Sequence, residues 1–177
     1  MKRILIAVGL VICCLALAGW IQPDSPAPVA QVVALDECDP TTFNAAEGPD
    51  FCKNIALGYS TTLQNLVAEA ASGNPDKNWD FEPDTLRVKE GTTLSVVDQG
   101  GEQHTFTEVK QFGGGFVAAL NSNQSPVPEC AAGYGDVAVA KTRILQGSTS
   151  LVTGLSKGTH YFQCCIHPWM RFKVEVQ

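Results

Sequence analysis

Short runs of β-branched and aromatic residues follow one another through residues 79–177 and limit the possible folds most strongly. Glycines separate these runs at residues 91, 100–101, 147, 154 and 158. Several short strands with regular turn signals are typical of an antiparallel sandwich or barrel. We therefore expect an all-β domain over residues 79–177, with strands at Thr85–Lys89, Thr92–Val97, Thr105–Val109, Val137–Ala140, Ser148–Val152, Thr159–Cys165 and Phe172–Val176.

A glycine-, asparagine-, serine- and proline-rich stretch from Gln111 to Pro128 interrupts this pattern and includes three successive glycines, 113–115. It is too long for a hairpin turn, so it is either a functional loop or a mobile one.

The first residues have the form of an export signal. Met1-Lys2-Arg3 is basic, residues 4–17 are almost wholly apolar, and Ala16-Leu17-Ala18 has the small-x-small form of a cleavage site. The run is shorter than the roughly 20 apolar residues of a membrane span. We expect a signal peptide over residues 1–18, a periplasmic or extracellular protein and no stable span after cleavage. An uncleaved anchor, or a lipoprotein through Cys13 or Cys14, is the alternative.

Between the signal and the β domain we expect two segments. Prolines dominate residues 23–28, so residues 19–36 are interpreted as an extended linker. Residues 37–78 form a small extension with one helix, in which Thr61 and Gln64 make a capping box and Gly73 ends the helix. Its apolar stripe is expected to lie on the sheet of the main domain and comprises Leu63, Leu66, Val67 and Ala70.

The residues with the most distinctive chemistry gather near the C-terminus. Cys164, His167 and Met170 are spaced Cys-x-x-His-x-x-Met in the turn between two expected strands. A thiolate, an imidazole and a thioether together suit copper better than magnesium or calcium. A blue-copper centre needs a second imidazole, and His104, where a glycine-rich turn enters a strand, can supply it.

Three segments together resemble a known family. They are residues 81–91, Gly101-Glu-Gln-His-Thr-Phe106, and the Cys-x-x-His-Pro-x-Met turn of residues 164–170. They resemble the small blue copper proteins, or cupredoxins, and among these the exported bacterial amicyanin and plastocyanin type. The resemblance covers roughly residues 79–177. It implies a Greek-key β-sandwich that binds one copper ion through His104, Cys164, His167 and an axial Met170.

The same resemblance implies a one-electron carrier that cycles between Cu(II) and Cu(I), with the exposed edge of His167 as the electron port. The formal net charge is −6. Loss of Lys2 and Arg3 with the signal leaves 10 basic against 18 acidic residues, a charge of −8. An acidic monomer of this kind favours a basic redox partner, such as a cytochrome.

Two residues depart from the family pattern. Thr105 stands where amicyanin-like proteins commonly have Asn after the first His, which predicts a less firmly tied ligand loop. Cys165 follows the ligand cysteine, and strand alternation directs it to the opposite face from Cys164. Cys165 is therefore the better disulfide candidate, with Cys130, although Cys164 could pair in its place. A second disulfide, from Cys38 to Cys52, is suggested by their closeness in sequence.

Each site residue also has a simpler interpretation. His104 could be a solvated turn residue, Cys164 an inert buried cysteine, and Met170 core packing. His160 is the rival imidazole, but its strand position fits a packed core residue. Trp169 either shields the copper or offers a partner an apolar contact.

Composition and spacing exclude other classes of function. The chain has 12 basic residues against 18 acidic ones, which argues against a nucleic-acid partner, and its 3 His cannot build a multicopper cluster. Cys164-Cys165-Ile166-His167 is not the haem c motif, and the thioether disfavours zinc. A filled mononuclear site leaves no place for a substrate, so an enzyme is disfavoured. A copper-delivery protein and a metal-free structural module remain as alternatives.

Overall fold

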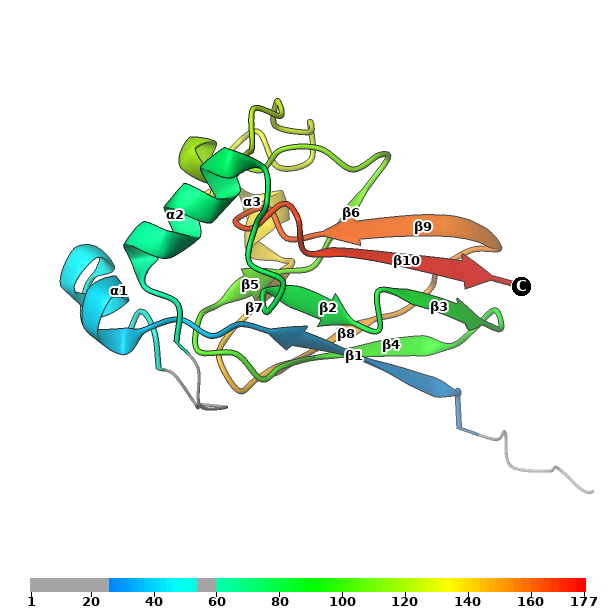
Figure 1. Ribbon diagram of the computed structural model, residues 1–177. Helices are drawn as coiled ribbons and strands as arrows, with labels where there is room; N and C mark the ends of the chain where they lie inside the picture. The colour runs from blue at the N-terminus through cyan, green and yellow to red at the C-terminus, as the bar shows by residue number, and fades with distance from the viewer. Residues whose placement is uncertain (1–25, 54–59) are drawn as a thin grey trace, which may run out of the picture.

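Two four-stranded sheets enclose the hydrophobic core of this protein (Figure 1). The computed structural model describes residues 26–53 and 60–177, so the expected signal peptide lies outside the described residues. One sheet has the order β2-β1-β4-β8 and the other the order β3-β10-β9-β6, while β5 and β7 form a short pair. The strands are β1 (Val29–Leu35), β2 (Asp80–Glu82), β3 (Thr85–Val88), β4 (Thr93–Asp98), β5 (His104–Thr105), β6 (Thr107–Val109), β7 (Arg143–Ile144), β8 (Thr149–Val152), β9 (Gly158–Gln163) and β10 (Arg171–Val176).

The expected all-β sandwich is thus present, and its core is aromatic. Phe106 stacks on Phe162 with ring centroids 4.4 Å apart, and Phe81 meets Phe106 edge-on at 5.0 Å. Alternation along β9 places Phe162 in this main core, whereas Tyr161 packs in a smaller cluster with Cys130 and Cys165. The two faces of one strand therefore serve two separate clusters, as a period of two requires.

Strand β1 corrects the linker predicted for residues 19–36. It pairs in parallel with β4 and antiparallel with β2, so it is an interior strand of its sheet. The proline-rich sequence stops at Pro28, and the next residues are mainly valine and alanine. Val32 and Ala34 are fully buried, and their burial stabilises the segment as a strand. The neighbouring prolines had favoured an extended linker in its place.

The extension contains two helices where one was expected. The additional helix α1 (Pro40–Glu47) begins after Asp39, whose side chain accepts from Thr42 N at 2.9 Å. Phe43 is the buried residue of this helix, so the sequence has no apolar stripe from which α1 could be predicted. Helix α2 (Leu63–Ser72) is the predicted one and ends at Gly73 in the left-handed conformation, but its N-cap is Thr62.

Helix α2 does not lie on a sheet face as predicted. It packs against α1 and the 3-10 helix η1 (Ala118–Leu120), at the end of the sandwich where the β9–β10 turn lies (Figure 1). Leu66 and Ala70 on its apolar stripe are buried. The extension therefore covers the end of the molecule that carries the predicted ligands.

The segment between β6 and β7 also differs from expectation. Val137–Ala140, predicted as a strand, is the short helix α3, because the Asp136 side chain accepts from Ala138 N at 2.8 Å and caps it. Within residues 26–53 and 60–177, no helix is long and apolar enough to cross a membrane.

Two disulfides fix these outer segments. Cys38 bonds to Cys52, and Cys130 bonds to Cys165, as the sequence analysis favoured. Cys164 is the free cysteine of the described chain, and it is buried.

Candidate metal centre

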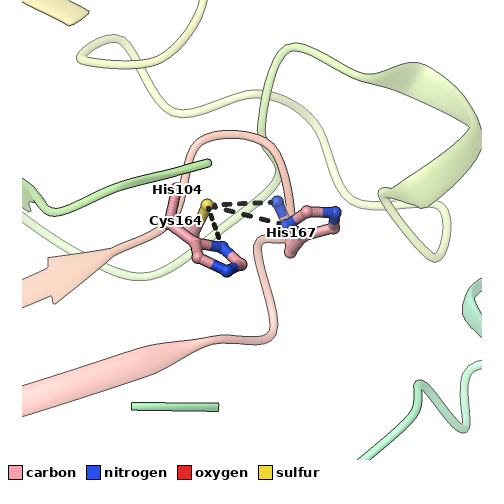
Figure 2. Close-up of side chains that lie close together, drawn as sticks. All are labelled: His104, Cys164 and His167. Carbon is pink, nitrogen blue, oxygen red and sulfur yellow. Dashed lines mark hydrogen bonds between the residues drawn. The ribbon is translucent and has the colours of Figure 1, made fainter. Parts of the chain in front are cut away.

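Three predicted ligands converge at the end of the sandwich that the helices cover. Cys164 follows β9, His167 lies in the turn to β10, and His104 begins β5. The Sγ atom of Cys164 is 3.9 Å from Nδ1 of His104 and 3.9 Å from Nδ1 of His167 (Figure 2). All three side chains are buried, and one ligand atom from each lies within 4.8 Å of the others.

Backbone hydrogen bonds shape the ligand turn. Cys164 N donates to Met170 O at 3.1 Å, and Met170 N donates to His167 O at 2.9 Å, which closes the turn between β9 and β10. Met170 is fully buried at its end. Its role as an axial ligand stays a prediction.

The Cys164 sulfur is surrounded by donors. Thr105 N lies 3.4 Å and His167 N 3.5 Å from Sγ. Burial raises the pKa of Cys164, but the hydrogen bonds and charges of His104 and His167 outweigh it and hold that pKa well below its usual value. The site therefore favours a thiolate, the form in which cysteine binds metals.

A buried carboxylate holds the outer nitrogen of each imidazole. Asp36 Oδ2 lies 2.9 Å from Nε2 of His104, and Glu102 Oε2 lies 3.1 Å from Nε2 of His167. Such partners fix the tautomer and orientation of a metal-binding histidine, with Nδ1 directed inward here. Neither carboxylate was among the site residues predicted from the sequence. Glu102 stands two residues before His104, a usable signal, whereas Asp36 directly follows strand β1, whose residues were predicted to be linker.

Asp36 is held in place by backbone donors. Its carboxylate accepts from Gly101 N at 2.9 Å, Glu102 N at 3.0 Å and Cys38 N at 3.2 Å. Burial raises the pKa of Asp36, but the hydrogen bond and charge of His104, with these backbone donors, lower it overall to about 2. A Cβ atom on Gly100 would lie 1.8 Å from Asp36 Oδ2, so glycine is required beside the carboxylate.

The structure corrects the predicted electron port. His167 was expected to expose its edge, yet it is only 2% exposed. Trp79 lies against it with ring centroids 6.1 Å apart and Trp169 at 5.5 Å, while Trp79 Nε1 donates to Glu102 Oε2 at 3.4 Å. The shielding role considered for Trp169 is consistent with this contact.

Thr105 and His160 were the other residues considered near the site. Thr105 ties the ligand loop, because its Oγ1 accepts from Cys165 N at 2.7 Å, and a weaker tie than asparagine would give stays a prediction. His160 is not among the converging residues. It is a partly buried residue, not the packed core residue expected, with ring nitrogens 2.6 Å from Glu108 Oε1 and 2.8 Å from Ser156 O.

The donor set fits copper. One thiolate and two imidazoles, with a buried thioether in the same turn, are soft and borderline ligands. Hard cations such as magnesium prefer oxygen ligands and water. The three ligand side chains are also buried, which suits a metal that keeps its ligands.

Comparisons with known proteins give distant likenesses to solved structures. A reduced mutant of amicyanin is 20% identical over 58% of this chain and 76% of that chain, with a TM-score of 0.35. A purple cupredoxin from Nitrosopumilus maritimus is 13% identical over 84% of this chain and 99% of that chain, with a TM-score of 0.40. No family model and no curated protein matches the chain.

Proposed function

We propose that this protein is an exported mononuclear blue-copper protein that carries single electrons and is not an enzyme. His104, Cys164 and His167 would hold the ion, with Met170 as the fourth ligand. The observation that carries the proposal is the convergence of two imidazole Nδ1 atoms on one buried, free cysteine sulfur. Copper bound there would supply one-electron chemistry between Cu(II) and Cu(I).

The chain's own residues would keep the site rigid. Asp36 and Glu102 fix the two rings from outside, and Thr105 N and His167 N donate to the cysteine sulfur. Hydrogen bonds of this kind tune the potential of a copper site. Burial of all three residues also favours retention of the ion over its delivery to another protein.

The partner proposed for this carrier is a basic redox protein such as a cytochrome. The chain has a formal net charge of −6, and opposite charge speeds encounter in a salt-dependent way. Because His167 is buried, such a partner would dock over its covering residues and not on the imidazole edge.

Visible absorption and EPR spectra of the purified protein loaded with Cu(II) test the proposal. We expect an intense thiolate-to-copper band and narrow copper hyperfine splitting. Both should vanish in Cys164→Ser and persist in a matched Cys130→Ser/Cys165→Ser double variant, which removes a neighbouring disulfide without leaving a spare thiol. A colourless protein with ordinary tetragonal copper signals would contradict the proposal.

A further inference from the structure

We propose that an apolar pocket beside His167 binds a small neutral aromatic molecule carrying one hydrogen-bond donor, of the phenol class. The pocket has a volume of about 260 Å³ and reaches His167 and Glu102. Helices α1 and α2, the segment around η1 and the ligand turn all contribute to it. Its apolar lining includes Phe43, Phe51, Leu66, Val67, Leu120 and Ile166.

The size of the pocket suits one ring. An apolar cavity of about 150 Å³ can bind benzene, and drug-sized ligands occupy roughly 300–1,000 Å³. A volume of about 260 Å³ lies between these values. It therefore fits a single ring with small substituents.

The polar groups of the pocket select the chemistry of the ligand. Glu102 Oε2 accepts from His167 Nε2 and Trp79 Nε1, and in the part of the chain that the structure describes no other donor to its side chain is recorded. A carboxylate has about four acceptor positions, so Glu102 can accept a further hydrogen bond from a bound molecule. A hydroxyl on the ring supplies that donor.

Charge excludes anionic ligands of the same size. Glu102 is one carboxylate of the lining, and Glu47, an exposed residue of α1, is another. A like charge brought beside a buried carboxylate is strongly disfavoured. Benzoate should therefore be rejected where phenol is accepted, and toluene, which lacks a donor, should bind more weakly.

Isothermal titration calorimetry of the metal-free protein with phenol, toluene and benzoate tests this inference. We expect saturable binding of phenol, at least tenfold weaker binding of toluene, and no binding of benzoate. Ala119 lines the pocket and is exposed, so Ala119→Trp should obstruct it and weaken phenol binding at least tenfold. Ala118→Trp is the matched control, because Ala118 is the exposed neighbour outside the lining.

Val67→Phe is a second pocket variant, which keeps the test available if Ala119→Trp folds poorly. It reduces the pocket volume from the α2 side and should also weaken phenol binding. Absence of phenol binding, equal affinity for benzoate, or unchanged affinity in both pocket variants would overturn the inference. Because the titration uses metal-free protein, these results do not depend on whether the site takes up copper.

Discussion

Replacing Asp36 with asparagine tests whether a carboxylate is needed behind His104. Asp36 Oδ2 accepts from His104 Nε2 and Glu102 N, and Oδ1 accepts from Gly101 N and Cys38 N. An asparagine side chain keeps one acceptor oxygen and replaces the other with an NH₂ group. Turned toward Gly101 N and Cys38 N, the NH₂ group would face two buried donors. Turned the other way, it would face Glu102 N, and His104 would have to take its other tautomer.

Two routes give the size of the effect. A buried polar group left without its partner costs about 1–3 kcal/mol, so one or two unsatisfied donors cost about 1–6 kcal/mol. Burial raises the pKa of Asp36, but the same hydrogen bonds lower it overall from 3.8 to about 2, which corresponds to roughly 2–3 kcal/mol at about 1.4 kcal/mol per unit. Because the folded-state pKa is the lower one, this stability is present above about pH 4 and is lost as the pH falls through 2.

Urea denaturation of the metal-free protein at pH 7 measures the change. We expect Asp36→Asn to lower the free energy of unfolding by about 2–5 kcal/mol and to weaken copper binding by roughly 10–100-fold. Asp39→Asn is the control, since Asp39 is only partly buried and asparagine caps helices about as well as aspartate. Equal stability of the two variants, with unchanged copper affinity, would refute the role given to Asp36.

Two other predictions concern the surroundings of the site. A Cβ atom on Gly115 would lie 2.0 Å from Cys165 O, so Gly115→Ala should cost about 1–3 kcal/mol in urea denaturation. Gly135→Ala, which meets no atom within 4 Å, should change stability by less than about 0.5 kcal/mol, and equal losses in both would contradict the clash. The hydrogen bond to Glu108 raises the pKa of His160, so Glu108→Gln should bring that pKa back toward 6.5 in an NMR titration. Because the pKa of His160 is raised in the folded state, its ion pair with Glu108 stabilises the fold at low pH, and this stabilisation is lost as the pH rises through the folded-state pKa. An unchanged His160 pKa in Glu108→Gln would exclude Glu108 as the cause of the raised pKa.

The β domain and the converging ligands could be predicted because both depend on local sequence. Alternation along residues 159–165 separates Cys164 from Cys165, and the structure has those two sulfurs in different clusters. Helix α2 was predicted from its apolar spacing, and Gly73 ends it in the left-handed conformation that glycine favours. The strand predicted for Val137–Ala140 was wrong, because a run of valine and alanine suits a strand as well as a helix. The Asp136 side chain caps the segment and so favours the helix.

The supporting carboxylates could not be predicted in the same way, because their roles depend on distant contacts. Asp36 is 68 residues from His104, and its burial follows from the pairing of β1 with β4. The covering of His167 likewise depends on where the two helices pack, which periodicity does not specify. A ligand motif therefore indicates which atoms meet a metal, but not what surrounds them.

Strand β1 makes the N-terminal segment inseparable from the sandwich, and truncation shows how. A chain beginning at residue 37 keeps all predicted ligands and both disulfides but loses β1, which lies between β2 and β4. The loss exposes the core that Val32 and Ala34 seal, at about 1.5–3 kcal/mol for a buried valine. It also leaves β2 without a paired strand and β4 paired on one side only, with β8, at about 0.5–1.5 kcal/mol for each lost hydrogen bond. Over the length of the strand this equals the roughly 5–15 kcal/mol by which a domain is stable, so the truncated protein should lack a cooperative thermal transition by circular dichroism. A chain beginning at residue 26 should melt like the full protein. If the chain beginning at residue 37 melted cooperatively and bound copper, the interpretation of residues 19–36 as a linker would be supported and the role given to β1 refuted.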